Sequence, residues 1–132
     1  MLSPRRQVLC SFLLTSLVLA CAIAAQAQRG TSVVRRVQFP RGRTTAILRG
    51  AVRRGVSHDY LLGAREGQRM SVHLTANGDA SFSIMSPNGN SLADFVSDWS
   101  GELPESGDYR INVLPPTRNN KPAQYTLEVT IR

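Results

Sequence analysis

The sequence predicts an all-β protein, an antiparallel β-sandwich of roughly seven to nine short strands. Beyond residue 27, apolar residues recur at every second position and not at helical spacing, which is typical of strands with one buried and one solvated face. Gly, Pro and Asn clusters interrupt these runs at short intervals, as in sandwiches and partly open barrels. Without its first 27 residues the 132-residue chain keeps 105, enough for one domain and too few for two.

The first 27 residues differ from the rest of the chain in composition. Arg5 and Arg6 precede an apolar run over residues 8–25, and Ala-Gln-Ala at 25–27 supplies small residues at a cleavage spacing. This pattern indicates a signal peptide over 1–27, followed by a single domain over 28–132. We therefore expect a periplasmic or secreted protein, and no other segment is long and apolar enough to span a bilayer.

The two cysteines, Cys10 and Cys21, both lie within this leader. Because small Ala20 precedes Cys21, an alternative is a lipoprotein signal cleaved before Cys21, which would tether the protein to the outer membrane. The exported domain has no cysteine in either case. That excludes a disulfide scaffold, a zinc ribbon and a cysteine nucleophile.

The expected strands are bounded by residues that favour turns. Apolar positions alternate most clearly in Met70-Val72-Leu74, Ala80-Phe82-Ile84, Tyr109-Ile111-Val113 and Tyr125-Leu127-Val129-Ile131. Turns are expected at Arg53-Arg54-Gly55, Glu66-Gly67-Gln68, Asn77-Gly78-Asp79, Pro87-Asn88-Gly89, Glu105-Ser106-Gly107-Asp108 and Asn119-Asn120-Lys121-Pro122. In chain order, the strands are expected near 33–39, 45–53, 57–64, 69–76, 79–86, 90–94, 96–103, 107–114 and 123–132. The single tryptophan, Trp99, is expected to pack over the core, while stacking on a sugar would need an exposed indole.

Charge divides the exported domain into two unequal parts. Residues 28–69 hold ten arginines against two acidic residues, whereas residues 70–132 hold four basic residues against seven acidic ones. One face or end should therefore be cationic, which suits an anionic envelope polymer or an acidic cleft of another protein. Export makes nucleic acid an unsuitable partner.

The residue sets that enzymes need are missing from the sequence. The only histidines are His58, before Asp59 at a turn into a strand, and His73, on the expected solvent face, and both are expected to be solvated. Two histidines without cysteine make a poor zinc site, and no calcium loop or glycine-rich phosphate loop is present. Glu102 and Glu105 have no spacing that suggests a glycosidase. We expect a binding protein that is not an enzyme and has no metal or cofactor.

One segment resembles a known type of module. Residues 103–113, Leu-Pro-Glu-Ser-Gly-Asp-Tyr-Arg-Ile-Asn-Val, resemble the Ser-Gly-x-Tyr hairpin of pre-peptidase C-terminal β-sandwich modules. The same motif recurs in bacterial periplasmic inhibitors of lysozymes, and over roughly residues 36–132 the chain is most similar to inhibitors of goose-type (g-type) lysozyme. The similar segments are residues 37–46, Gly50, Asp59-Tyr60, residues 64–68, residues 71–73 and Thr117-Arg118-Asn119.

The resemblance implies that the hairpin and the following loop form one edge that enters the lysozyme's substrate cleft. The residues implied are Ser106, Gly107, Tyr109 and Arg118. An arginine on a rigid loop could hydrogen-bond the general-acid carboxylate of such a cleft and exclude the sugar. Gly107 would turn the backbone, and Tyr109 would brace the loop from below.

The chain departs from the family pattern in two places. Val56 stands where the pattern has an aromatic residue, and the loop after Thr117-Arg118-Asn119 is shorter, so that Lys121 is the nearest substitute for a second arginine. Lysine supplies a point charge and no planar fork, so a contact there would be less specific. The lysozyme preference of this chain could differ accordingly.

An alternative function is a non-catalytic module that binds anionic polymers of the cell envelope. It would use the arginines of the first half, namely Arg35, Arg36, Arg41, Arg43, Arg49, Arg53 and Arg54. If Arg41, Arg43 and Arg49 stood at alternate positions of a strand, they would share one face.

Overall fold

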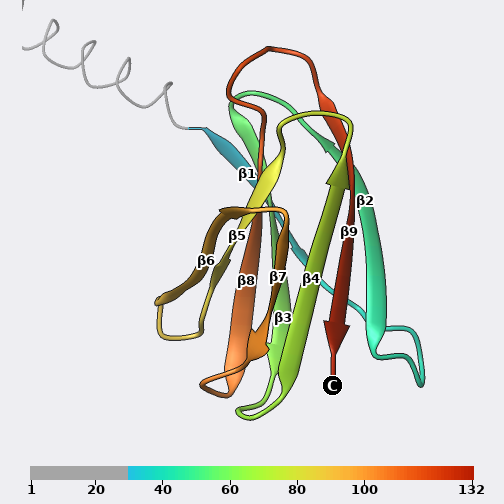
Figure 1. Cartoon of the computed structure of the whole chain (residues 1–132), viewed down its shortest axis with the longest axis vertical. Coiled ribbons are helices and arrows are strands. Elements are labelled where there is room, and N and C mark those ends of the chain that lie inside the picture. The colour runs from blue at the N-terminus through green and yellow to red at the C-terminus, as the bar shows by residue number, and fades with distance from the viewer. Residues whose placement is uncertain (1–29) are drawn as a thin grey trace, which may run out of the picture.

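Two stacked β-sheets make up residues 30–132, the part of the chain that the computed structural model describes (Figure 1). The expected signal over 1–27, with Cys10 and Cys21, lies outside the described residues. Within them there is no helix, and hence none that could cross a membrane. The strands are β1 (Thr31–Arg36), β2 (Thr45–Val52), β3 (Val56–Ala64), β4 (Arg69–Ala76), β5 (Ser81–Met85), β6 (Ser91–Val96), β7 (Asp98–Glu102), β8 (Gly107–Leu114) and β9 (Ala123–Ile131).

The expected β-sandwich is confirmed, and each expected strand is present with bounds that differ by at most three residues. Its basis is visible in β4, where Met70, Val72 and Leu74 are buried and the residues between them face solvent. The same alternation buries one side of β8 and of β9. Period-two patterning therefore sets which side of each strand faces the core.

The chain passes repeatedly from one sheet to the other. One sheet has the order β1-β3-β8-β5-β6 and the other β2-β9-β4-β7, and only the β5–β6 connection stays within a sheet. Neighbouring strands are antiparallel except β1 and β3, which are parallel.

Apart from the β6–β7 connection, the crossing connections gather at the two ends of the sandwich (Figure 1). We call the end with the β2–β3, β4–β5 and β8–β9 connections the upper pole, drawn at the top of Figure 1. The end with the β1–β2, β3–β4 and β7–β8 connections is the lower pole.

The core lies between the sheets and is built from the inward-facing residues of both. Its largest fully buried side chains are Tyr109, Phe82, Leu62, Met70, Ile84, Leu103, Ile111 and Leu127. Trp99 packs against this core from the edge strand β7 and is partly buried. Its indole lies so close to Gly101 that a Cβ there would come within 2.8 Å of the ring, so Gly101 makes room for the tryptophan.

A polar network joins the two sheets inside the upper half of the sandwich. The Tyr125 hydroxyl on β9 lies 2.5 Å from the Tyr60 hydroxyl and 2.7 Å from His58 Nδ1, both on β3. The expectation that His58 is a solvated strand histidine is therefore wrong, because its ring faces inward and is half-buried. Gly50 allows this arrangement, since a Cβ at that position would lie 2.7 Å from the Tyr125 hydroxyl oxygen.

Burial sets the protonation of this network. Desolvation, with a smaller contribution from the positive charge of Arg35, lowers the pKa of His58, so the folded protein favours the neutral imidazole. Burial and the hydrogen bond from Tyr60 raise the pKa of Tyr125, which keeps its hydroxyl protonated. The shifts at His58 and Tyr125 both favour the uncharged form of the side chain.

We expect His58 to make stability depend on pH. In the unfolded chain the imidazole takes up a proton near its ordinary pKa of 6.5, whereas the folded chain resists protonation. The free energy of unfolding should therefore decrease as pH falls below about 6.5. Urea denaturation of the unsubstituted protein and of His58→Gln, between about pH 7.5 and 5, measures the effect. The decrease should be smaller in the variant, and equal decreases in both would contradict this role for His58.

Candidate functional site

The Ser-Gly-x-Tyr segment forms a corner between the two sheets. It was expected to be a hairpin, but β7 belongs to the four-stranded sheet and β8 to the five-stranded one, so residues 103–106 cross the lower pole. The buried Leu103 anchors the corner, because its N–H donates to Gln68 O and its carbonyl accepts from Gly67 N. The hairpin expectation failed because a short turn signal does not reveal whether the strands beside it pair.

Tyr109 braces this corner from below, as the sequence predicted. Its ring is fully buried, and its hydroxyl donates to the Glu105 carbonyl at 2.6 Å and accepts from the Glu105 N–H at 3.2 Å. The arrangement is similar to the tyrosine corner of other β-sandwiches. Tyr109 is thus already satisfied within the fold and has no exposed surface to offer a partner.

Gly107 and Ser106 are also used by the fold. Gly107 has a φ of +141°, and a Cβ at that position would come within 2.9 Å of Pro87. The exposed Ser106 accepts a hydrogen bond of 2.9 Å from the Glu66 N–H, which ties the corner to the β3–β4 turn. Beside them Arg36 makes a two-pronged bond to Asp108 at 3.0 and 2.8 Å, which lowers the pKa of that carboxyl.

Arg118 lies on the β8–β9 loop at the upper pole. Its side chain is 85% exposed, and its nearest carboxylate, that of Asp79, is 3.8 Å from Nε. That separation is beyond hydrogen-bond distance, so the guanidinium keeps its donors available. Lys121 is exposed on the same loop, and its N–H donates to the Asn119 side chain.

The structure does not bring the expected site residues together. Ser106, Gly107 and Tyr109 stand at the start of β8, whereas Arg118 and Lys121 follow its end. At about 3.3 Å per residue, β8 separates the two groups by roughly 23 Å. They point from opposite poles, so the expectation of a single edge formed by the corner and the Arg118 loop is wrong.

The arginines of the first half are also divided between the poles. Arg41 and Arg43 lie in the β1–β2 connection at the lower pole, whereas Arg49 lies on β2, so the shared strand face expected for them is absent. Arg53 and Arg54 precede β3 at the upper pole, where Arg54 donates to the Asn120 side chain at 3.3 Å.

Two polar groups on the outer faces of the sheets were not anticipated. Asp59 is 5% exposed although it faces outward, because Arg110, at 3.3 Å, and Asn112 bond its carboxylate from β8. The exposed His73 bonds Asp98 on the neighbouring strand β7. On the side of His73 away from Asp98, the pairing of β4 with β9 places Glu128 opposite His73. The charged and polar residues of both groups were visible in the sequence, but only strand pairing brings together residues that are so far apart in the chain.

Nothing in residues 30–132 groups three potential metal ligands of the His, Cys, Asp or Glu type. Asp98, His73 and Glu128 lie in a row along the sheet and do not converge on one point. The exposed positions of these groups suit contacts with solvent or a partner surface.

We expect Tyr109→Phe to destabilise the fold. The change keeps the buried ring but removes a hydroxyl that both donates to and accepts from Glu105, which should lower the free energy of unfolding by about 1–2 kcal/mol. Urea denaturation of the variant and of the unsubstituted protein measures this. A Tyr109→Phe protein as stable as the unsubstituted one would show that the corner does not depend on the hydroxyl.

Comparison with solved structures identifies similar proteins. PliG of Aeromonas hydrophila, a periplasmic lysozyme inhibitor of g-type lysozyme, is 28% identical with a TM-score of 0.71, over 77% of this chain and 98% of that one. PliG of Salmonella Typhimurium, with the same description, is 25% identical with a TM-score of 0.63, over 77% and 100% of the chains. The pre-peptidase C-terminal domain of a Bacillus anthracis collagenase, 9% identical with a TM-score of 0.51 over 76% and 94%, shares the fold.

Comparison by sequence alone gives no matching family model and no matching curated protein. The similar structures nevertheless agree with both parts of the resemblance expected from the sequence, the lysozyme inhibitors and the pre-peptidase C-terminal module. The two PliG proteins are described as inhibitors, in agreement with the conclusion that this chain is not an enzyme. The chain is therefore a β-sandwich protein whose fold is similar to that of two periplasmic inhibitors of g-type lysozyme, with 28% and 25% sequence identity over the superposed residues.

Proposed function

We propose that this protein inhibits a lysozyme of the goose type by inserting the β8–β9 loop of its upper pole into the enzyme's substrate cleft. The similarity to two inhibitors of g-type lysozyme supports the activity. The exposure of Arg118, whose donors are not taken up by any of residues 30–132, is the observation that supports this loop as the contact. The protein would act by occlusion, without chemistry of its own.

Arg118 suits the chemistry of a lysozyme cleft. Glycoside hydrolysis depends on a carboxylic acid beside the scissile bond. A guanidinium can bind such a carboxylate with two parallel hydrogen bonds while filling the place of the sugar. The weak pairing with Asp79 would cost little to break, because both side chains are more than half exposed.

The loop around Arg118 is held in place before binding. Pro116 is buried beneath it, and Arg54 bonds the Asn120 side chain from the β2–β3 turn. At the end of the loop, the Asn77 side chain accepts from the Gln124 N–H at 2.9 Å. An ordered loop loses less conformational entropy on binding, which favours affinity.

Charge at the upper pole supports the same contact. Arg53, Arg54, Arg118 and Lys121 are exposed there, and the carboxylate of Asp79 lies 3.8 Å from Arg118. A cationic pole would be attracted to the carboxylates that line a glycosidase cleft. Within it, Lys121 is the proposed secondary contact, with less directional bonding than a second arginine would give.

Ser106, Gly107 and Tyr109 have a different role in this proposal. They hold the corner at the lower pole, and one cleft could not receive them together with Arg118. We assign them to the scaffold, because the bonds of Ser106 and Tyr109 are made within the chain.

A lysozyme partner also bears on where the protein works. Both similar inhibitors are described as periplasmic, which supports a periplasmic or secreted location here. The signal peptide over 1–27 would deliver the protein there. With the alternative lipoprotein signal, lipidation at Cys21 would retain the inhibitor at the outer membrane.

Arg118→Ala should weaken inhibition of g-type lysozyme by about tenfold to a hundredfold, because hydrogen bonds to a charged group contribute roughly 1.5–3 kcal/mol. Residual lysis of a peptidoglycan suspension, with purified protein titrated against g-type, c-type and i-type lysozymes in parallel, measures the loss. The g-type enzyme should be inhibited most strongly.

Two control variants locate the contact. Arg49→Ala removes an arginine from β2, and Ser106→Ala removes a hydroxyl from the corner; both should inhibit like the unsubstituted protein. Inhibition lost in Ser106→Ala and kept in Arg118→Ala would move the contact to the lower pole. Absence of inhibition of all three lysozymes would overturn the proposed function.

A further inference from the structure

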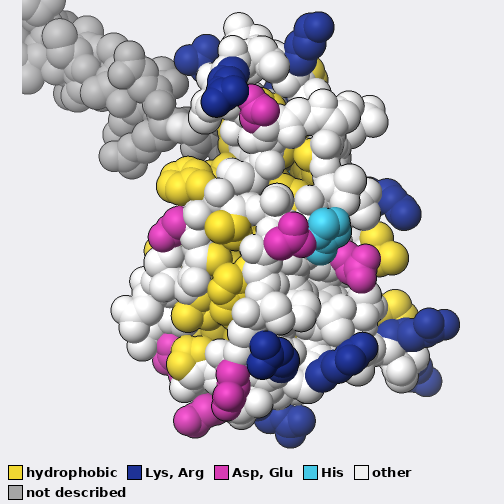
Figure 2. All heavy atoms as spheres, in the orientation of Figure 1, with side chains coloured by type: hydrophobic (Ala, Val, Ile, Leu, Met, Phe, Trp, Pro, Cys, Tyr) yellow, Lys and Arg dark blue, Asp and Glu magenta, His cyan; other side chains and the backbone are white. Residues whose placement is uncertain are grey.

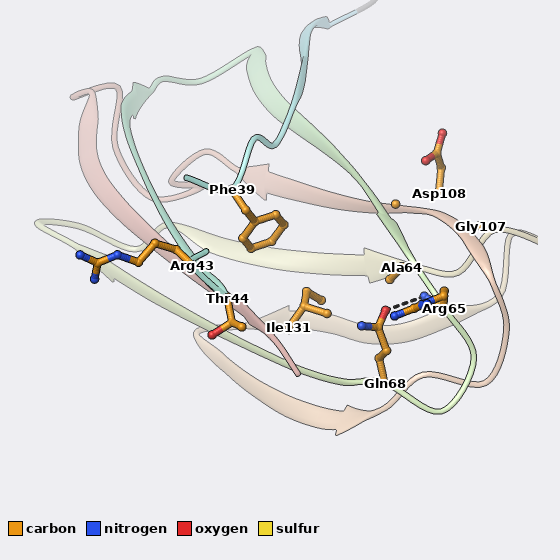
Figure 3. A pocket seen from close by; sticks show the side chains of 10 residues that line it. Phe39, Arg43, Thr44, Ala64, Arg65, Gln68, Gly107, Asp108 and Ile131 are labelled. Carbon is orange, nitrogen blue, oxygen red and sulfur yellow. Dashed lines mark hydrogen bonds between the residues drawn. The ribbon is translucent and has the colours of Figure 1, made fainter. Parts of the chain in front are cut away.

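A pocket opens at the lower pole, where the two sheets end and the β1–β2 connection crosses between them. Its volume is about 570 Å³, which is within the range of small-molecule sites. Figure 3 shows the Phe39 ring directed into this space above Ile131, with Ala64 on the far side. The small side chain of Ala64 leaves the opening that these two larger side chains only partly fill.

The pocket has an apolar floor and a cationic rim. Phe39, Ala64 and Ile131 supply the floor, Arg65 lies at the rim, and Arg43 lies at the opposite side with its guanidinium directed away from the floor (Figure 3). Gln68 lies beside Arg65, and its side-chain oxygen accepts from the Arg65 N–H at 2.8 Å. The amide nitrogen of Gln68 is therefore left to donate toward a ligand.

Positive charge dominates the part of the lower pole that surrounds this opening. Five arginines end or connect strands here and, among the described residues, none makes an ion pair: Arg41, Arg43, Arg65, Arg69 and Arg132. Figure 2 shows basic side chains gathered at the lower right of the molecule and acidic ones at the lower left.

The carboxylates of this pole do not cancel that charge at the pocket. Asp108 is the acidic residue that lines it, and Arg36 neutralises Asp108 with two hydrogen bonds. Glu102 and Glu105 belong to β7 and the corner after it. Glu66 is next to Arg65 but is not among the lining residues.

We propose that this pocket binds an anionic amphiphile, with an acyl or similar apolar group on the Phe39 floor and a phosphate or carboxylate at the Arg65 and Gln68 rim. Charge complementarity selects the anion, and the burial of apolar surface supplies most of the affinity. The pocket is at the pole opposite Arg118, so a protein held to a lipid or glycolipid in this way would still present its upper pole. The proposal does not depend on inhibition of lysozyme.

The test is titration of the 15N-labelled protein, observed by NMR, with four soluble probes. The three amphiphilic probes are kept below their critical micelle concentrations. Dihexanoyl phosphatidate and decanoate carry both an apolar group and an anion; dihexanoyl phosphatidylcholine lacks the net charge, and inorganic phosphate lacks the apolar group. We expect saturable shifts in residues 37–44, 63–68 and 131 with the first two, and at least tenfold weaker binding of the others. Stronger binding of phosphatidate than of decanoate would indicate that the natural ligand is a phospholipid or glycolipid. Stronger binding of decanoate would indicate a fatty acid.

Variants separate this site from general attraction of anions to a basic protein. Arg43→Gln with Arg65→Gln should weaken phosphatidate binding at least tenfold, and Phe39→Ala should weaken it without changing the response to phosphate. A matched pair, Arg49→Gln with Arg53→Gln, removes the same charge elsewhere and should bind normally. Three results would overturn the proposal. They are an equal loss of phosphatidate affinity in both arginine pairs, chemical-shift changes spread over the whole surface, and phosphatidylcholine binding as tightly as phosphatidate. Lysozyme inhibition should persist in Arg43→Gln with Arg65→Gln. A failure of the pocket to bind an anionic amphiphile is therefore distinguishable from a failure of the proposed lysozyme inhibition.

Discussion

The constraint on which the rest of this structure depends is that each strand can bury only one of its sides. Two sheets satisfy it by facing each other, and the chain satisfies it by passing to the opposite sheet after almost every strand. Nearly all connections therefore lie at one of two poles, about the length of β8 apart. Function in a fold of this kind is carried by surface connections on a rigid support, so the alternation decides which loops can act together.

The strands and their buried sides could be predicted from the sequence because both depend on residues that are neighbours in the chain. Met70, Val72 and Leu74 alternate with polar residues, and turn-forming residues such as Gly55 and Gly67 adopt the positive φ that they tolerate. The bracing role of Tyr109 was implied by the resemblance to the lysozyme inhibitors, and the bond that provides it is local, to a residue four positions away.

Properties that depend on pairing could not be predicted in the same way. His58 is drawn inward by Tyr125, which is 67 residues away in the chain. The corner at Ser106 has the residues of a hairpin turn, but the pairing of β8 with β3 and β5 makes it a crossing. For the same reason, the residues that the resemblance implied as one edge lie at opposite poles.

The poles divide the chemistry of the molecule. At the upper pole a loop presents an exposed arginine whose donors no residue of 30–132 takes up, which suits an acidic cleft. At the lower pole the Ser-Gly-x-Tyr corner is satisfied internally, and beside it lies an apolar pocket rimmed by arginines. A bound protein above and a bound envelope lipid below would not compete for surface.

Hydrogen exchange of the protein, alone and mixed with g-type lysozyme, tests this division most directly, because backbone amides covered by a partner exchange more slowly. Mass spectrometry of peptides covering residues 53–55, 115–122 and 103–106 would locate the contact. The account predicts slower exchange in the first two segments and unchanged exchange in the third. Protection confined to residues 103–106 would contradict it and place the lysozyme at the lower pole.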